Sequence, residues 1–157
     1  MKKILFAFVA FCMMCACSGE REYLNCHGLS MSMSAKAMAD SFEARGLAVD
    51  TSHSNETQIV LADTLACNYT LVIYQHNDTI SDILETYIAT YNDSTSQLWQ
   101  KLHDELQKEL DVWPGMPHHG DLHKEADYTT GAGTIVLTLL NTYSPTVTVR
   151  YSTQINQ

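Results

Sequence analysis

Basic residues are scarce in this chain of 157 residues. Lys and Arg together number 9 against 18 Asp and Glu, so the formal net charge is −9. Binding to nucleic acid or to an anionic membrane surface through charge requires a basic patch. The composition therefore argues against nucleic acid as a partner.

Sequence signatures of catalysis and nucleotide binding are also missing. The chain has no Gly-x-Ser-x-Gly, no Ser-x-x-Lys, no Walker pattern and no Gly-x-Gly-x-x-Gly. The short Gly131-Ala132-Gly133 precedes a predicted strand rather than a helix, so we interpret it as a turn. We therefore predict no catalytic residue.

Long apolar runs are missing except at the N-terminus. Ile4 to Ala16 is continuously apolar and follows Lys2 and Lys3. As a helix this run rises about 20 Å, too little for a hydrocarbon core of about 30 Å. The pattern is typical of a secretory signal. With 3 Pro, no repeat and no linker composition, we divide the chain into a signal (1–16), a tether (17–27) and one domain (28–157).

The end of the signal is more specific. Met14-Cys15-Ala16-Cys17 resembles the lipobox of bacterial lipoproteins. This resemblance implies that Cys17 becomes the first mature residue and carries diacylglycerol and an N-acyl chain such as palmitate. Ser18 in the next position favours the outer membrane. It does not distinguish the periplasmic face of that membrane from its outer face. The alternative is a plain cleaved signal.

Removal of the signal leaves two cysteines besides Cys17, namely Cys26 and Cys67. In an oxidising compartment two such thiols usually pair. We predict a Cys26–Cys67 disulfide, the alternative being two separately buried thiols. The mature chain has no Cys-x-x-Cys, which argues against a redox-active pair.

Two helices are predicted. The first covers about 35–45, capped by Ser32 or Ser34 and ended by Gly46, with Met38 and Phe42 facing the core. The second has a capping-box pattern at Ser94 and then leucines every four residues at 98, 102, 106 and 110. Pro114-Gly115 ends any continuation.

Strand composition appears at 58–62, 69–74, 134–140 and 146–152. Residues 80–91 fit either a helical stripe or a strand; we favour a strand at 82–91. The expected fold class is α+β, an antiparallel sheet of about five strands with two helices on one face, in the order α-β-β-β-α-β-β.

This layout is similar to a group of small Bacteroidetes lipoproteins, most without a defined activity. The similarity rests on Gly28-Leu29, on the segment from Phe42 to Leu47, on Trp99 to Leu110 and on Val147 to Tyr151. It covers about 125 residues. These motifs are structural, so the resemblance implies no catalytic residues.

The densest polar group is the segment 113–123. His118, His119, Asp121 and His123 are candidate ligands for Zn²⁺ or Cu²⁺. The prolines and glycines there predict a loop, in which the spacing of the histidines does not fix a common face. The alternative is a mobile polar loop with unrelated histidines and no cofactor.

Two further surface features are expected. Trp113 and Met116 are candidates for an exposed contact surface, whereas Trp99 is expected in the core. Thr64, Thr79 and Ser94 each follow an Asp, which resembles the O-glycosylation motif of exported Bacteroidetes proteins. Ordinary turn and cap chemistry accounts for the same pattern.

These features together predict a lipid-anchored cell-envelope protein that binds another envelope protein or component without catalysis. The alternative from another class is a metal-dependent or hydrolytic enzyme that uses the loop with His118, His119 and His123. A third interpretation is an inhibitor-like domain that docks onto an exported enzyme.

Overall fold

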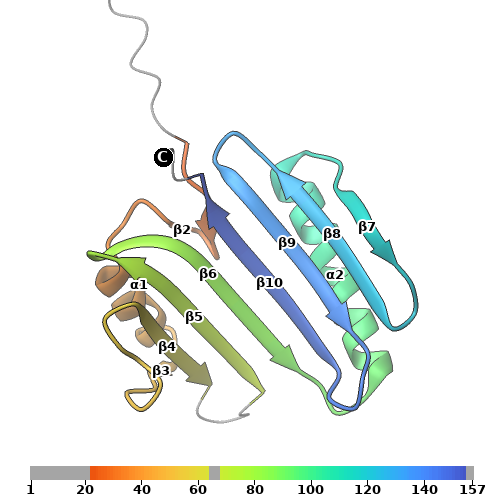
Figure 1. The fold of residues 1–157 in the computed structure, drawn as a ribbon, viewed down its shortest axis with the longest axis horizontal. Helices are drawn as coiled ribbons and strands as arrows, with labels where there is room; N and C mark the ends of the chain where they lie inside the picture. The colour runs from red at the N-terminus through yellow and green to blue at the C-terminus, as the bar shows by residue number, and fades with distance from the viewer. Residues whose placement is uncertain (1–21, 64–67, 155–157) are drawn as a thin grey trace, which may run out of the picture.

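The computed structural model describes residues 22–63 and 68–154. Those residues form two helices and ten strands, eight of them in one antiparallel sheet. The predicted α+β domain with about five strands is therefore wrong, because strands dominate the fold (Figure 1). In chain order the elements are β1 (Asn25–Cys26), β2 (Leu29–Ser30), α1 (Ala35–Glu43), β3 (Leu47–Val49), β4 (Gln58–Asp63), β5 (Tyr69–His76), β6 (Thr79–Ile88), α2 (Asn92–Leu110), β7 (Gly115–His119), β8 (His123–Thr129), β9 (Gly133–Leu140) and β10 (Thr146–Thr153).

The large sheet has the strand order β3-β4-β5-β6-β10-β9-β8-β7. This order consists of two similar units, each a helix followed by a four-stranded meander. The fourth strands of the units, β6 and β10, pair antiparallel at the centre, where Glu85 lies opposite Val149. The units are therefore related by an approximate two-fold axis normal to the sheet. The prediction of a chain without repeats misses this architectural repeat.

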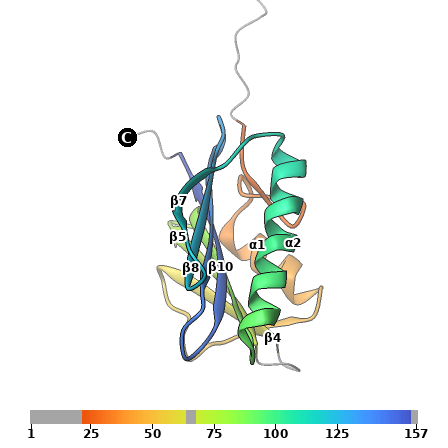
Figure 2. The ribbon, with the colours of Figure 1, turned by 90° about the vertical axis from the view of Figure 1, so that its right-hand side faces the viewer.

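Both helices lie on the same face of the sheet (Figure 2). The strands alternate, so that β9 and β10 turn one set of apolar side chains towards the helices. The buried members of this set are Ile135, Leu137, Leu139, Val147, Val149 and Tyr151. The opposite face carries a row of threonines in register across β5, β6, β10 and β9, namely Thr70, Thr86, Thr148 and Thr138. One face is thus the core and the other is polar.

Helix α1 follows the expected local chemistry. The Ser34 side chain caps it by accepting a hydrogen bond from the Ala37 amide, and Met38 and Phe42 are buried. Gly46 follows the helix with a φ of 103°, a conformation that glycine tolerates without strain. The predicted cap, buried face and stop signal are confirmed.

Helix α2 begins earlier than the capping-box pattern predicts. Its N-cap is Tyr91, which makes no side-chain cap bond, so Ser94 lies inside the first turn. Thr95 is fully buried there, and its hydroxyl lies 2.8 Å from Asn141 Oδ1 in the β9–β10 connection. A tertiary contact therefore fixes this helix start more than a local cap does. Trp99 is buried, as predicted.

The predictions for residues 82–91 and 113–123 have different outcomes. The strand interpretation of residues 82–91 is confirmed, with bounds shifted to Thr79–Ile88. The predicted loop at 113–123 is instead largely the β7–β8 hairpin. All of β7 is exposed at the sheet edge, and β8 buries only Ala126 and Tyr128. Neither strand has the regular apolar alternation that would reveal it in the sequence.

Gly133, at the start of β9, is required by a close backbone approach. Its φ is 151°, and a Cβ at this position would collide with the Ser152 carbonyl oxygen of β10. We expect Gly133→Ala to lower the free energy of unfolding by about 3 kcal/mol, combining backbone strain and overpacking. Urea unfolding would measure it. Gly120→Ala is the matched control, because its Cβ would meet only the His123 carbonyl at 3.5 Å; equal losses in both variants would contradict this account.

Candidate ligand-binding site

The short hairpin β1–β2 lies between the two helices, over the centre of the sheet (Figures 1 and 2). Cys26 pairs with Leu29, and the two residues between them, His27 and Gly28, have φ angles of 49° and 75°. Two positive φ angles in a two-residue connection are typical of a type I′ turn. Arg45 Nη1 donates to the His27 carbonyl oxygen at 2.9 Å. The turn therefore holds the His27 imidazole at a defined place.

Beneath this turn lies a buried carboxylate. Glu85 is on the core face of β6, and its side chain is 1% exposed. Its Oε1 lies 2.8 Å from His27 Nε2 and 3.2 Å from Cys26 Sγ, and its Oε2 accepts a bond from the Tyr87 hydroxyl at 2.6 Å. A buried carboxylate is costly unless it is paired and hydrogen-bonded. Three donors from two separate parts of the chain meet this requirement.

The Glu85 carboxylate shifts the pKa values of its neighbours. Its hydrogen bond raises the pKa of His27, against the opposing effects of partial burial and of Arg45, while Glu109 of α2 adds a smaller increase. Burial, and then the Glu85 charge, raises the pKa of the Cys26 thiol well above its usual range. The same two causes raise the pKa of Tyr87. Cys26 and Tyr87 therefore stay protonated and act as donors.

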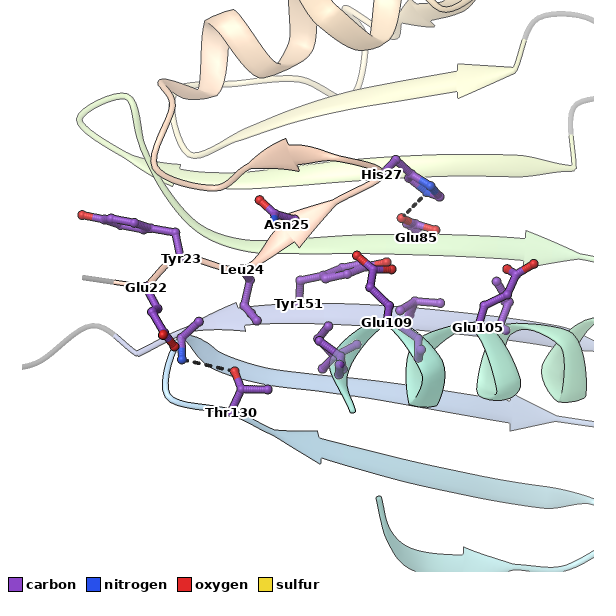
Figure 3. Close-up of a pocket in the computed structure, with 16 residues that line it drawn as sticks. Glu22, Tyr23, Leu24, Asn25, His27, Glu85, Glu105, Glu109, Thr130 and Tyr151 are labelled. Carbon is purple, nitrogen blue, oxygen red and sulfur yellow. Dashed lines mark hydrogen bonds and ion pairs between the residues drawn. The ribbon is translucent and has the colours of Figure 1, made fainter. Parts of the chain in front are cut away.

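A pocket of about 470 Å³ opens beside this cluster (Figure 3). Its walls are α2, the segment from Glu22 to His27, and strands β9 and β10. Apolar side chains of α2 and of the sheet form much of the lining: Leu102, Leu106, Leu110, Ile135 and Val149. Four carboxylates also line it, those of Glu22, Glu85, Glu105 and Glu109, and its described lining contains no Lys or Arg. The pocket is thus suited to a cation that carries an apolar part.

One surface cation competes for these carboxylates. Lys101 Nζ lies 3.8 Å from Glu105 Oε1, one turn away on α2, and both side chains are mostly exposed. Exposed pairs of this kind contribute little, typically about 0.2–1 kcal/mol. The pair therefore leaves Glu105 available to a ligand.

The described residues show no arrangement suited to nucleophilic catalysis. Asp50, Ser52 and His53 lie together in one exposed turn, but His53 Nδ1 faces both the Asp50 carboxylate and the Ser52 hydroxyl. A catalytic triad needs the two ring nitrogens to face different partners. The Cys26 thiol is buried and held protonated, so it is a poor nucleophile.

The four predicted metal ligands do not converge. His118 and His123 stack with ring centroids 4.3 Å apart, and His123 Nε2 lies 3.7 Å from Glu125 Oε2. In the register of the two strands, His118 lies opposite Glu125 and His119 lies opposite Lys124. Because successive side chains of a strand point to opposite faces, His118 and His119 face different sides of the sheet. Asp121 is exposed in the connection to β8. Zn²⁺ binding at this hairpin stays a prediction.

The other predicted surface residues are accessible where they are described. Trp113 is 88% exposed and Met116 39% exposed, as a contact surface requires. Thr79 and Ser94 are exposed, whereas Thr64 lies outside the described residues. Their glycosylation stays a prediction.

Cys26 carries a free, buried thiol in the structure. Its predicted partner, Cys67, lies outside the described residues, as does the predicted lipidation site Cys17. Asn68, which follows Cys67, accepts a bond from the Ile88 amide, three residues along β6 from Glu85. In the described part of the chain the Cys26 thiol donates a hydrogen bond to the Glu85 carboxylate, and the disulfide with Cys67 stays a prediction.

His27 and Glu85 are not among the site residues predicted from the sequence. A signal for each is present: His-Gly at 27–28 is a turn pair, and Glu85 is an acidic residue between Leu84 and Thr86 in a strand. Their partnership is not visible in the sequence, because 58 positions separate them.

The ion pair predicts a pH-dependent contribution to stability. Because the folded pKa of His27 is raised above its ordinary value near 6.5, the contribution is complete below about pH 6.5 and disappears as pH rises through the folded pKa. We expect His27→Gln to lower the free energy of unfolding more at pH 6 than at pH 9, measured by urea unfolding with a chelator present. His76→Gln, which removes an exposed imidazole at the end of β5, is the control. An equal loss at both pH values in His27→Gln would contradict the pairing.

Comparison of the chain with protein-family models, with curated proteins and with solved structures gives no match to any of them.

Proposed function

We propose that this protein is a lipid-anchored, non-enzymatic binding module of the cell envelope, and that its ligand is a small organic cation held in the acidic pocket. The observation that carries the proposal is the lining of that pocket. It combines four glutamates with the leucine-rich face of α2, and its described lining contains no Lys or Arg. The imidazole of His27, which also lines the pocket, is already paired with Glu85. Such a lining favours an amine on an alkyl chain.

The two exposed glutamates of α2 suit this ligand. Glu105 and Glu109 are four residues apart, so they lie on one side of the helix and both line the pocket. An ammonium group about 4 Å from one carboxylate gains about 4 kcal/mol of Coulomb energy at an effective dielectric constant of about 20, before desolvation is subtracted. An alkyl chain then covers Leu102 and Leu106, at about 0.8 kcal/mol for each buried methylene group.

The anchor would place this pocket close to the membrane. Glu22, at the rim, is five residues after Cys17, a reach of at most about 18 Å for an extended chain. Neither helix in the described residues is long and apolar enough to cross a bilayer. Lipid on Cys17 would therefore supply the attachment, and the outer membrane is the proposed location.

Amine binding provides a direct test of the pocket. We expect cadaverine to bind the mature protein in calorimetric titration, and pentanol, which has a similar chain without the charge, to bind far more weakly. Glu105→Gln with Glu109→Gln should weaken cadaverine binding by roughly 25-fold, about 1 kcal/mol for each carboxylate.

The matched control removes the same charge elsewhere. Glu43 and Glu56 are exposed and lie outside the pocket lining, so Glu43→Gln with Glu56→Gln should leave the affinity within about twofold. Equal weakening in both double variants would show a general effect of net charge, and the pocket proposal would then fail.

Lipid attachment is tested separately. In cells of the source organism, the wild-type protein should fractionate with membranes and have an intact mass that begins at Cys17 with added acyl chains. Cys17→Ser should move it to the soluble fraction, whereas Cys67→Ser should not. Membrane association that persists in Cys17→Ser would contradict the anchor.

A further inference from the structure

A second kind of site adjoins the inner end of the pocket. Cys26 Sγ, a ring nitrogen of His27 and a Glu85 carboxylate oxygen all lie within 4.8 Å of one another, and among the described residues no other His, Cys, Asp or Glu group of three is so close. We propose that these three side chains bind a divalent transition-metal ion of the Zn²⁺ class. This goes beyond the proposed amine pocket: it shares His27 and Glu85 with the pocket lining, but it adds Cys26, does not use Glu105 or Glu109, and relies on different chemistry.

The donor set matches such an ion. Zn²⁺ prefers thiolate sulfur, imidazole nitrogen and carboxylate oxygen in a tetrahedral arrangement, with metal–ligand distances of about 2.0–2.3 Å. Ligand atoms around such an ion are then roughly 3.3–3.7 Å apart. The present spacings from Glu85 Oε1, 2.8 Å to His27 and 3.2 Å to Cys26, need to increase by less than about 1 Å. With three protein ligands, the fourth position is left for water or a ligand from the adjoining pocket.

Metal binding requires the loss of a proton from the Cys26 thiol. The S–H bond breaks, its proton goes to solvent together with any proton on the coordinating His27 nitrogen, and S–M, N–M and O–M bonds form. The thiolate and the Glu85 carboxylate then offset the +2 charge of the ion within the cluster.

Surrounding contacts orient the ligands as metal sites require. Tyr87 holds Glu85 Oε2, which leaves Oε1 directed at His27 and Cys26. Arg45 holds the His27 carbonyl oxygen, and the Phe42 ring packs edge-on against the imidazole at 6.3 Å. Such outer contacts fix ligand orientation and raise affinity. The site is therefore largely preformed.

The proposal requires a reduced Cys26, so it excludes the Cys26–Cys67 disulfide in the same molecule. The experiment is a Co²⁺ titration of detergent-solubilised mature protein under a phosphine reductant. We expect tetrahedral cobalt bands with a thiolate-to-cobalt charge-transfer band, and release of one to two protons for each ion. Cys26→Ser should abolish the charge-transfer band, and His27→Gln should weaken binding at least tenfold.

Two controls separate the alternatives. Cys67→Ser keeps Cys26 from pairing and should retain the full spectrum, and His118→Ala with His123→Ala should retain it too. Absence of the charge-transfer band in Cys67→Ser, or its persistence in Cys26→Ser, would overturn the site. Circular dichroism checks that each variant is folded, and His27→Gln, at an exposed turn, covers the case in which Cys26→Ser fails to fold.

The proposal of a metal site and the proposal of an amine pocket can be tested independently. Glu105→Gln with Glu109→Gln should leave the cobalt spectrum unchanged, because neither residue is a proposed ligand. Loss of the cobalt spectrum in that double variant would show that the metal sits among the helix glutamates instead, and would overturn the assignment to Cys26, His27 and Glu85.

Discussion

The Glu85 carboxylate, buried on the central strand β6, is the constraint on which this structure depends. An ion at the middle of a core is costly unless donors surround it. Tyr87 of the same strand supplies one donor, and the β1–β2 hairpin supplies two more, Cys26 and His27. The hairpin is therefore held over the sheet by a polar interaction as well as by the burial of Leu24 and Met31.

The two-unit architecture explains why a pocket exists beside this carboxylate. Each helix covers mainly the strands of its own unit, α1 over β3 to β5 and α2 over β8 to β10. The seam where β6 meets β10 is therefore covered by neither helix alone. The N-terminal hairpin fills one part of the seam, and the acidic pocket occupies the part next to α2 (Figure 3). Carboxylates from three separate segments, Glu22, Glu85 and the α2 pair, consequently face one space.

Local chemistry made much of the fold predictable. Ser34 and Gly46 delimit α1, and the alternation of Val147, Val149 and Tyr151 identifies β10. The β7–β8 hairpin was not predictable, because an exposed edge strand needs no apolar pattern and its partner buries only two side chains. The site was even harder to predict from the sequence. It arises from the pairing of His27 with Glu85 across 58 positions, which no local pattern reports.

A double-mutant cycle between His27 and Glu85 tests the central claim most directly. The free energy of unfolding would be measured at pH 6 for the wild type, His27→Gln, Glu85→Gln and the double variant. If the hairpin imidazole satisfies the buried carboxylate, the coupling energy should be at least about 1 kcal/mol, as for side chains in direct contact. A coupling energy near zero, with additive losses, would show that the two side chains are independent and would contradict the account.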